Sequence, residues 1–126
     1  SDNPEHALMH GPTFMGNALA CSVALKSIEL FEQEDYMAKI SRIDKISRRE
    51  MGDFTDPRIK EVRIMGGCVC VEVHDPAVLD GFQQFAYERG VFSRPFLKYM
   101  YSMVPYVIQE DELAQVFDTM KAWFRR

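Results

Sequence analysis

A pair of adjacent glycines, Gly66 and Gly67, constrains the fold of this chain more than any other feature. The pair separates two runs that are rich in β-branched and other apolar residues, 59–65 and 68–74. A two-residue turn between antiparallel strands needs positive φ angles, which a Gly-Gly pair supplies. The sequence therefore predicts a β-hairpin centred on these glycines.

The predicted turn also fixes the register of the hairpin. Three pairs of residues then lie opposite each other: Met65 and Cys68, Ile64 and Val69, Val62 and Val71. The second and third pairs share one face of the hairpin because side chains on a strand alternate between faces. That face is apolar, so we expect it to lie against the core.

Helical patterns flank the hairpin. A helix over residues 17–33 begins at Asn17, a favourable N-cap. A second helix over residues 36–51 carries an apolar stripe that includes Met37 and Met51. We expect a third helix from Asp75 to Gly90 and a last one from about Gln109, with a buried stripe of Leu113, Val116, Phe117, Met120 and Phe124.

Two further short strands are expected near residues 91–94 and 100–104. The order of elements is then helix, helix, strand, strand, helix, strand, strand, helix. This order indicates an α+β fold, in which helices pack on a small, mainly antiparallel sheet.

The first predicted helix has an unusual surface. Residues 18–25 are apolar on almost every side. A helix of this kind is normally covered on most of its faces. We therefore expect this helix to pair with another surface, with a second copy of the chain as the first candidate.

Charge and composition narrow the classes of function. The chain has 126 residues and a formal net charge of −4, without the basic excess of a nucleic-acid-binding domain. No apolar run reaches the roughly 20 residues that span a bilayer. Three cysteines and the absence of an export signal predict reduced thiols in a cytoplasmic protein.

Four residues of metal-binding type alternate along one predicted strand: Cys68, Cys70, Glu72 and His74. Neighbours on the same face of a strand are about 6.6 Å apart. A tetrahedral zinc site holds its ligands within about 4 Å of each other, so one strand cannot provide it. We predict a half-buried sheet face here and no metal site.

Two other places suit the binding of anions. The glycine-containing loop ahead of the first helix offers the hydroxyl of Thr13 beside a helix N-terminus, a combination that suits phosphate. Arg94 lies between Phe92 and Phe96, where a guanidinium suits a carboxylate. Loop capping and an exposed arginine packed on phenylalanine are the alternative interpretations.

Three stretches of sequence carry a family resemblance. They are MHGPTFMGNALAC at residues 9–21, GVFSRPF at residues 90–96 and YSMVPYVI at residues 101–108. Together they resemble the adenosylmethionine–8-amino-7-oxononanoate aminotransferases, also called 7,8-diaminopelargonic acid synthases. This family belongs to the subgroup III aminotransferases of fold type I. Ala18 departs from the family, which usually has proline there.

The resemblance implies a role for four residues. Pro12 and Thr13 match positions that hold the phosphate of pyridoxal 5′-phosphate (PLP). Gly11 matches a substrate-contacting position in the same loop, which in this family reaches across a homodimer. Arg94 matches the arginine that binds the carboxylate of the substrate.

The resemblance also implies a reaction of biotin biosynthesis. An amino group passes from S-adenosylmethionine to 8-amino-7-oxononanoate and gives 7,8-diaminononanoate. The family's lysine, which forms the Schiff base with PLP, precedes the His-Gly-Pro-Thr loop by a few tens of residues. No lysine stands in the nine residues before His10, and Lys26 and Lys98 lie in other contexts. We therefore expect no catalytic residue in this chain and no activity from it alone.

The resemblance implies that the chain divides into two units. Residues 1–35 correspond to the end of the large PLP-binding domain, and residues 36–126 to the small C-terminal domain. Two alternatives stay open: another subgroup III aminotransferase, acting on an ω-amino acid or acetylornithine, and a complete small α+β domain that binds a metabolite or protein.

Overall fold

The computed structural model describes residues 11 and 13–126. The chain divides into two compact units, Ser1–Asp35 and Tyr36–Arg126. The assignment of the first unit to the end of a larger cofactor-binding domain stays a prediction.

The first unit contains helix α1, Ala18–Gln33. The helix begins after Asn17, whose side-chain oxygen accepts a hydrogen bond of 2.9 Å from the backbone N–H of Ala20. This cap confirms the predicted start. None of the residues of α1 is buried, and the exposed fraction of Leu19 is 73%.

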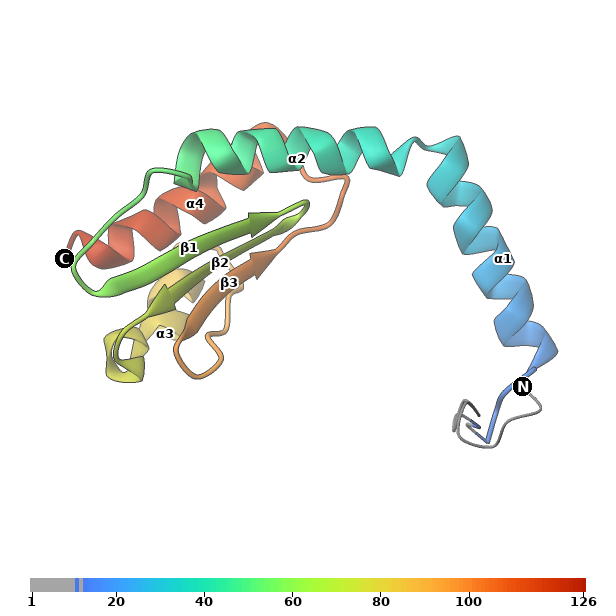
Figure 1. The fold of residues 1–126 in the computed structure, drawn as a ribbon, viewed down its shortest axis with the longest axis horizontal. Helices are drawn as coiled ribbons and strands as arrows, with labels where there is room; N and C mark the ends of the chain where they lie inside the picture. Colours follow the sequence, from blue (N-terminus) through green and yellow to red (C-terminus); the bar gives the residue numbers. More distant parts are fainter. Residues whose placement is uncertain (1–10, 12) are drawn as a thin grey trace, which may run out of the picture. The chain divides into compact units, whose positions relative to one another are not determined.

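The second unit has the α+β architecture that the sequence predicts (Figure 1). Three antiparallel strands lie in the order β1-β2-β3, so β2 is the central strand. The elements are α2 (Tyr36–Met51), β1 (Ile59–Met65), β2 (Cys68–Val73), a 3₁₀ helix η2 (Pro76–Leu79), α3 (Phe82–Tyr87), β3 (Tyr99–Met103) and α4 (Glu110–Phe124).

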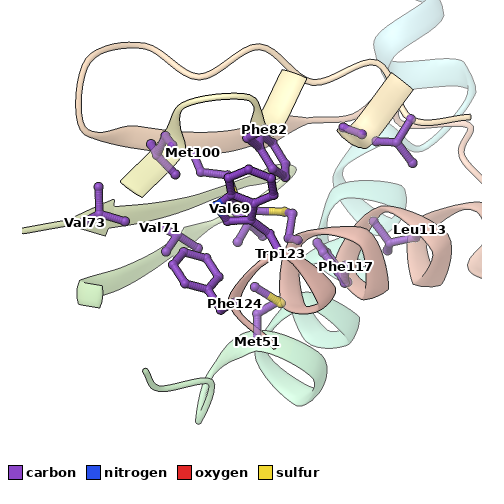
Figure 2. Packing of buried hydrophobic residues seen from close by; sticks show 14 of the residues in the cluster. Met51, Val69, Val71, Val73, Phe82, Met100, Leu113, Phe117, Trp123 and Phe124 are labelled. Carbon is purple, nitrogen blue, oxygen red and sulfur yellow. The ribbon is translucent and has the colours of Figure 1, made fainter. Parts of the chain in front are cut away.

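The core lies between one face of the sheet and the helices (Figure 2). Central strand β2 contributes Val69, Val71 and Val73, all buried. Helix α4 contributes the predicted stripe, in which Leu113, Phe117, Met120 and Phe124 are buried and Val116 is partly buried. Burial of apolar surface is the main force that holds such a unit together.

The hairpin has the predicted register: Met65 pairs with Cys68, Ile64 with Val69 and Val62 with Val71. The turn differs in one detail. Of the two glycines, Gly66 alone has a positive φ, of 56°, which fits a type II′ turn with glycine first. Its N–H donates a hydrogen bond of 2.9 Å to the carboxylate of Asp44, so helix α2 also holds the turn.

The predicted single helix from Asp75 to Gly90 is wrong. The structure instead has η2 and α3, separated at Gly81, whose φ is 84°. The indole Nε1 of Trp123 donates a hydrogen bond of 2.9 Å to the carbonyl of Val78. In a continuous α-helix that carbonyl would accept from the N–H of residue 82. A contact from α4 therefore takes the place of the helical bond.

The strand predicted over residues 91–94 is also wrong, since this segment pairs with no strand in the structure. Pro95 follows it, and its ring holds φ at about −65°, away from the values of an extended strand. The segment is joined to β3 by a side chain instead: the hydroxyl of Ser93 donates to the carbonyl of Tyr101 at 3.2 Å.

The stripe predicted on α2 needs one correction. Met37 is exposed rather than buried. The buried residues of α2 are Ile43, Ile46, Ser47 and Met51, so the contact with the core begins about two turns later than predicted.

The outer face of β2 carries a buried carboxylate. The side chain of Glu72 is 4% exposed and accepts from Lys60 and Arg63 of β1, each at 2.9 Å, and from Lys98 at 2.8 Å. These hydrogen bonds, led by those from Lys98 and Lys60, lower the pKa of Glu72 from 4.5 to about 2. The sheet face is half-buried as predicted, with Cys68 and Cys70 partly exposed, and at Glu72 it holds a nearly buried charge with three cationic partners.

We predict that Ser47→Ala stabilises the second unit. Ser47 is fully buried, and its hydroxyl has no hydrogen-bond partner in the described structure. In the folded protein this hydroxyl loses its hydrogen bonds to water without a replacement, and alanine has a higher helix propensity than serine. The substitution should therefore raise the free energy of unfolding by about 1 kcal/mol.

Urea denaturation of both proteins measures this difference. Ser41→Ala, at an exposed position of the same helix, is the matched control, because it changes helix propensity alone, by about 0.5 kcal/mol. A Ser47→Ala variant that gains no more than the control would contradict the prediction.

We also predict a pH-dependent effect of Glu72→Gln. Because folding lowers the pKa of Glu72 to about 2, its ionised form stabilises the protein fully above the unfolded pKa. That contribution disappears as the pH falls through the folded value. The melting temperature of the variant should lie below that of the parent at pH 7, and the gap should narrow between pH 4.5 and 2.

Thermal unfolding followed by circular dichroism across this pH range tests the effect. Glu61→Gln is the control because Glu61 is exposed and, among the described residues, forms an ion pair with Arg63 only. A gap for Glu72→Gln that is independent of pH would mean that the lost contribution is not electrostatic.

Candidate functional site

A cavity of about 460 Å³ lies where the segment before β3, β3 itself and the start of α4 meet. Arg94 is one of its lining residues. Much of the rest of the lining is apolar and includes Val91, Met103 and Ile108. The cavity thus combines one cation with a surface that suits an aliphatic chain.

The guanidinium of Arg94 has no partner among the residues that the structure describes. It is exposed, and no side chain or carbonyl in the described structure forms an ion pair or hydrogen bond with it. An arginine presents its donors in a planar fork that matches a carboxylate. Arg94 is therefore available for an anionic ligand.

The local backbone explains how Arg94 reaches this position. Gly90 closes the turn that follows α3 with a φ of 72°, which a residue with a side chain rarely adopts. The N–H of Val91 then donates to the carbonyl of Ala86 at 2.9 Å. Val91 and Ser93 turn inward and are buried, while Phe92 and Arg94 are exposed.

Polar groups of the cavity that the sequence did not single out come from two other elements. They are Ser102 of β3, and Glu112 and Gln115 of α4. The side chain of Gln115 also donates to the carbonyl of Arg89 at 2.8 Å. No spacing in the sequence relates α4 to Arg94, so only the tertiary structure brings these residues to the cavity.

The predicted phosphate-binding loop belongs to the first unit. Gly11 and Thr13 are exposed, and Thr13 lies in the turn that precedes α1. The N–H of Asn17 closes this turn on the carbonyl of Phe14 at 3.1 Å. Pro12 lies outside the described residues.

The loop residues fit the role of contacts to a phosphate group. The hydroxyl of Thr13 has no hydrogen bond to any described residue. A Cβ added at Gly11 would meet nothing within 4 Å. A free hydroxyl and an uncovered backbone are what a phosphate oxygen needs.

Lys26 and Lys98, which the sequence analysis set aside, are both engaged in ion pairs. Lys26 contacts Glu29 at 2.9 Å, and Lys98 contacts Glu72 at 2.8 Å. The hydrogen bond with Glu72 raises the pKa of Lys98 above its ordinary value. A protonated amine is no nucleophile, so Lys98 is not poised for covalent chemistry.

The strand that carries Cys68 and Cys70 is occupied by structural contacts. Among the described residues, no three His, Cys, Asp or Glu side chains lie close enough to hold a metal ion. Burial raises the pKa of Cys68, which favours an unreactive thiol. None of the helices in the part of the chain that the structure describes combines the length and hydropathy of a membrane span.

Comparison with known proteins gives consistent results. Residues 2–124 match the aminotransferase class-III family. The adenosylmethionine-8-amino-7-oxononanoate aminotransferase of Saccharomyces cerevisiae is 38% identical over 116 residues, which cover 86% of this chain and 24% of the yeast protein. The chain thus spans about a quarter of the length of this relative.

Two solved structures show the same fold. The adenosylmethionine-8-amino-7-oxononanoate aminotransferase of Methanocaldococcus jannaschii is 25% identical, with a TM-score of 0.76 over 94% of this chain and 30% of its own. The ornithine aminotransferase of Toxoplasma gondii, which has PLP at partial occupancy in its active site, is 29% identical, with a TM-score of 0.70 over 91% of this chain and 28% of its own.

The match therefore covers nearly the whole chain, both in sequence and in fold. The small-domain architecture and the solved neighbours are those of fold-type-I transaminases, a family that uses PLP. This chain belongs to the class-III aminotransferase family.

Proposed function

We propose that this chain is the C-terminal part of a PLP-dependent aminotransferase of biotin biosynthesis. The reaction transfers an amino group from S-adenosylmethionine to 8-amino-7-oxononanoate and gives 7,8-diaminononanoate. The names of the yeast and Methanocaldococcus relatives support this substrate pair. When bound, PLP supplies the electron sink for the amino transfer.

The unpaired guanidinium of Arg94 is the observation that carries the proposal. An 8-amino-7-oxononanoate molecule has a carboxylate at the end of an aliphatic chain. Arg94 offers a bidentate partner to such a carboxylate, and the apolar lining of the cavity suits the chain. In this proposal Arg94 binds and orients the substrate, and no residue of this chain moves a proton.

The loop ahead of α1 has a second role in the proposal. Pro12 and Thr13 hold the phosphate of PLP, and Gly11 contacts the substrate. The hydroxyl of Thr13, which has no hydrogen bond to a described residue, and the open space at Gly11 support these assignments. The lysine that binds PLP comes from outside this chain, because both described candidates are held by carboxylates.

Assembly as a cytoplasmic homodimer is part of the same proposal. The apolar residues of α1 give it support, since Leu19, Val23 and Ile28 are all largely exposed. Exposed apolar side chains of this kind are typical of an interface. Membership of the aminotransferase family favours this interpretation over a small domain that only binds a metabolite.

Another subgroup III reaction is the alternative, and the similarity to Toxoplasma ornithine aminotransferase keeps it open. The two reactions differ in the amino acceptor and donor. The acceptor of the biotin pathway is distinguished by a carboxylate on a long aliphatic chain. Arg94 is the residue proposed to bind that carboxylate, so it is the residue to test.

We predict that 8-amino-7-oxononanoate binds the chain more tightly than its methyl ester does. Arg94→Gln should reduce this preference by about 10- to 100-fold, because it removes a charged group that donates hydrogen bonds to the carboxylate. Isothermal titration calorimetry with both compounds gives the two dissociation constants.

Arg125→Gln provides the matched control, because it removes an exposed arginine from the other end of α4. It should leave the preference unchanged. Equal affinity of the parent chain for acid and ester, or a preference that survives Arg94→Gln, would contradict the proposed function.

We further predict that the chain alone does not form a covalent link to PLP. After incubation with equimolar PLP and reduction with borohydride, mass spectrometry should find no stoichiometric modification of Lys26 or Lys98. Both amines lie in ion pairs of 2.9 Å or less. A full equivalent of PLP on either lysine would show that this chain carries its own active centre.

A further inference from the structure

The segment that carries Arg94 is fastened to the edge of β3 by the side chain of the preceding residue. Ser93 is 8% exposed, and its hydroxyl donates to the carbonyl of Tyr101 at 3.2 Å. We propose that Ser93 is a positioning residue, which acts through Arg94 to orient the carboxylate of the substrate. This inference rests on the proposed function of Arg94.

A second contact fastens the other side of Arg94. The backbone N–H of Phe96 donates to the carbonyl of Tyr99, and the N–H of Tyr99 donates to the carbonyl of Phe96, both at 2.9 Å. Tyr99 and Tyr101 present backbone groups to the same edge because they are two residues apart on one strand. Arg94 therefore lies between two attachments to a single strand edge.

Between these attachments, Arg94 and Pro95 have no ladder bond to any described residue. The ring of Pro95 holds φ at about −65°, so an extended strand does not continue from Phe96 toward Arg94. The hydroxyl of Ser93 supplies the bond to the Tyr101 carbonyl that a paired strand would have supplied from its backbone. It is the nearest attachment on the N-terminal side of Arg94.

This attachment matters for binding because Arg94 has no partner of its own in the described structure. A side chain held by an ion pair keeps its orientation when the backbone loosens. The orientation of Arg94 depends instead on the backbone from which it projects. A bidentate contact to a carboxylate is sensitive to small displacements of that backbone.

The test compares the affinity for 8-amino-7-oxononanoate with that for its methyl ester in four proteins: the parent chain, Ser93→Ala, Arg94→Gln and the double variant. Ser93→Ala should lower the preference for the acid by about threefold to tenfold, the range expected for one lost hydrogen bond. The affinity for the ester should not change. In the Arg94→Gln background, Ser93→Ala should have no further effect, because the two residues act as one unit.

Two further variants separate positioning from a structural role. Ser93→Thr restores the hydroxyl and should recover the preference. Thr119→Val removes another buried hydroxyl that donates to a backbone carbonyl, that of Gln115 at 2.8 Å, and should leave the preference intact. If Ser93→Ala is too unstable to assay, Ser93→Cys gives the same comparison with a side chain of similar size and a weak donor.

The possible outcomes test the role of Arg94 and the role of Ser93 separately. If Arg94→Gln leaves the preference for the acid unchanged, the proposed function fails. If Arg94→Gln abolishes the preference but Ser93→Ala does not lower it, the role of Ser93 is overturned. The same conclusion follows if Ser93→Ala weakens acid and ester equally, or lowers the preference further in the Arg94→Gln background.

Discussion

The rest of the second unit depends on one constraint, which is that contacts on both faces hold the central strand β2 in place. Its inner face buries three valines against the helices. Its outer face holds the carboxylate of Glu72 under three cations, two from β1 and one from the residue before β3. A central strand held in this way determines where β3 lies. The edge of β3 in turn determines where the segment with Arg94 can attach.

Glu72 and Arg94 show how this small unit treats two charges differently. Glu72 is nearly buried and both of its oxygens accept hydrogen bonds from cations of the same unit, so its charge stabilises the structure. Arg94 lies in a segment that does not pair with the sheet, and no described group neutralises its charge. Because this segment does not pair in the sheet, the guanidinium is exposed, while the contacts of Ser93 and Phe96 with β3 keep the backbone of Arg94 in place. The edge of β3 therefore leaves the side chain of Arg94 exposed and holds its backbone in order.

The successes and failures of sequence-based prediction follow from the range of the interactions involved. The hairpin register was predictable because turn chemistry and side-chain alternation act between neighbours and agree with each other. The cap of α1 at Asn17 is local in the same sense. The helix over residues 75–90 was mispredicted because Trp123, more than forty residues away, takes the carbonyl of Val78. The strand at residues 91–94 was mispredicted because a serine side chain replaces its ladder.

The sequence by itself determined the α+β class, the hairpin and its register, the stripe of α4 and the family, since these depend on local patterns and on motifs. It also identified Arg94 and Thr13 as candidate site residues, because the motifs that contain them can be recognised from the order of residues alone. Only the tertiary structure decided that Arg94 lacks a partner, that a cavity reaches from it to α4, and that Ser93 fastens it to β3. These properties depend on which distant residues come within a few ångströms of each other, and the packing of β2 against the helices decides that.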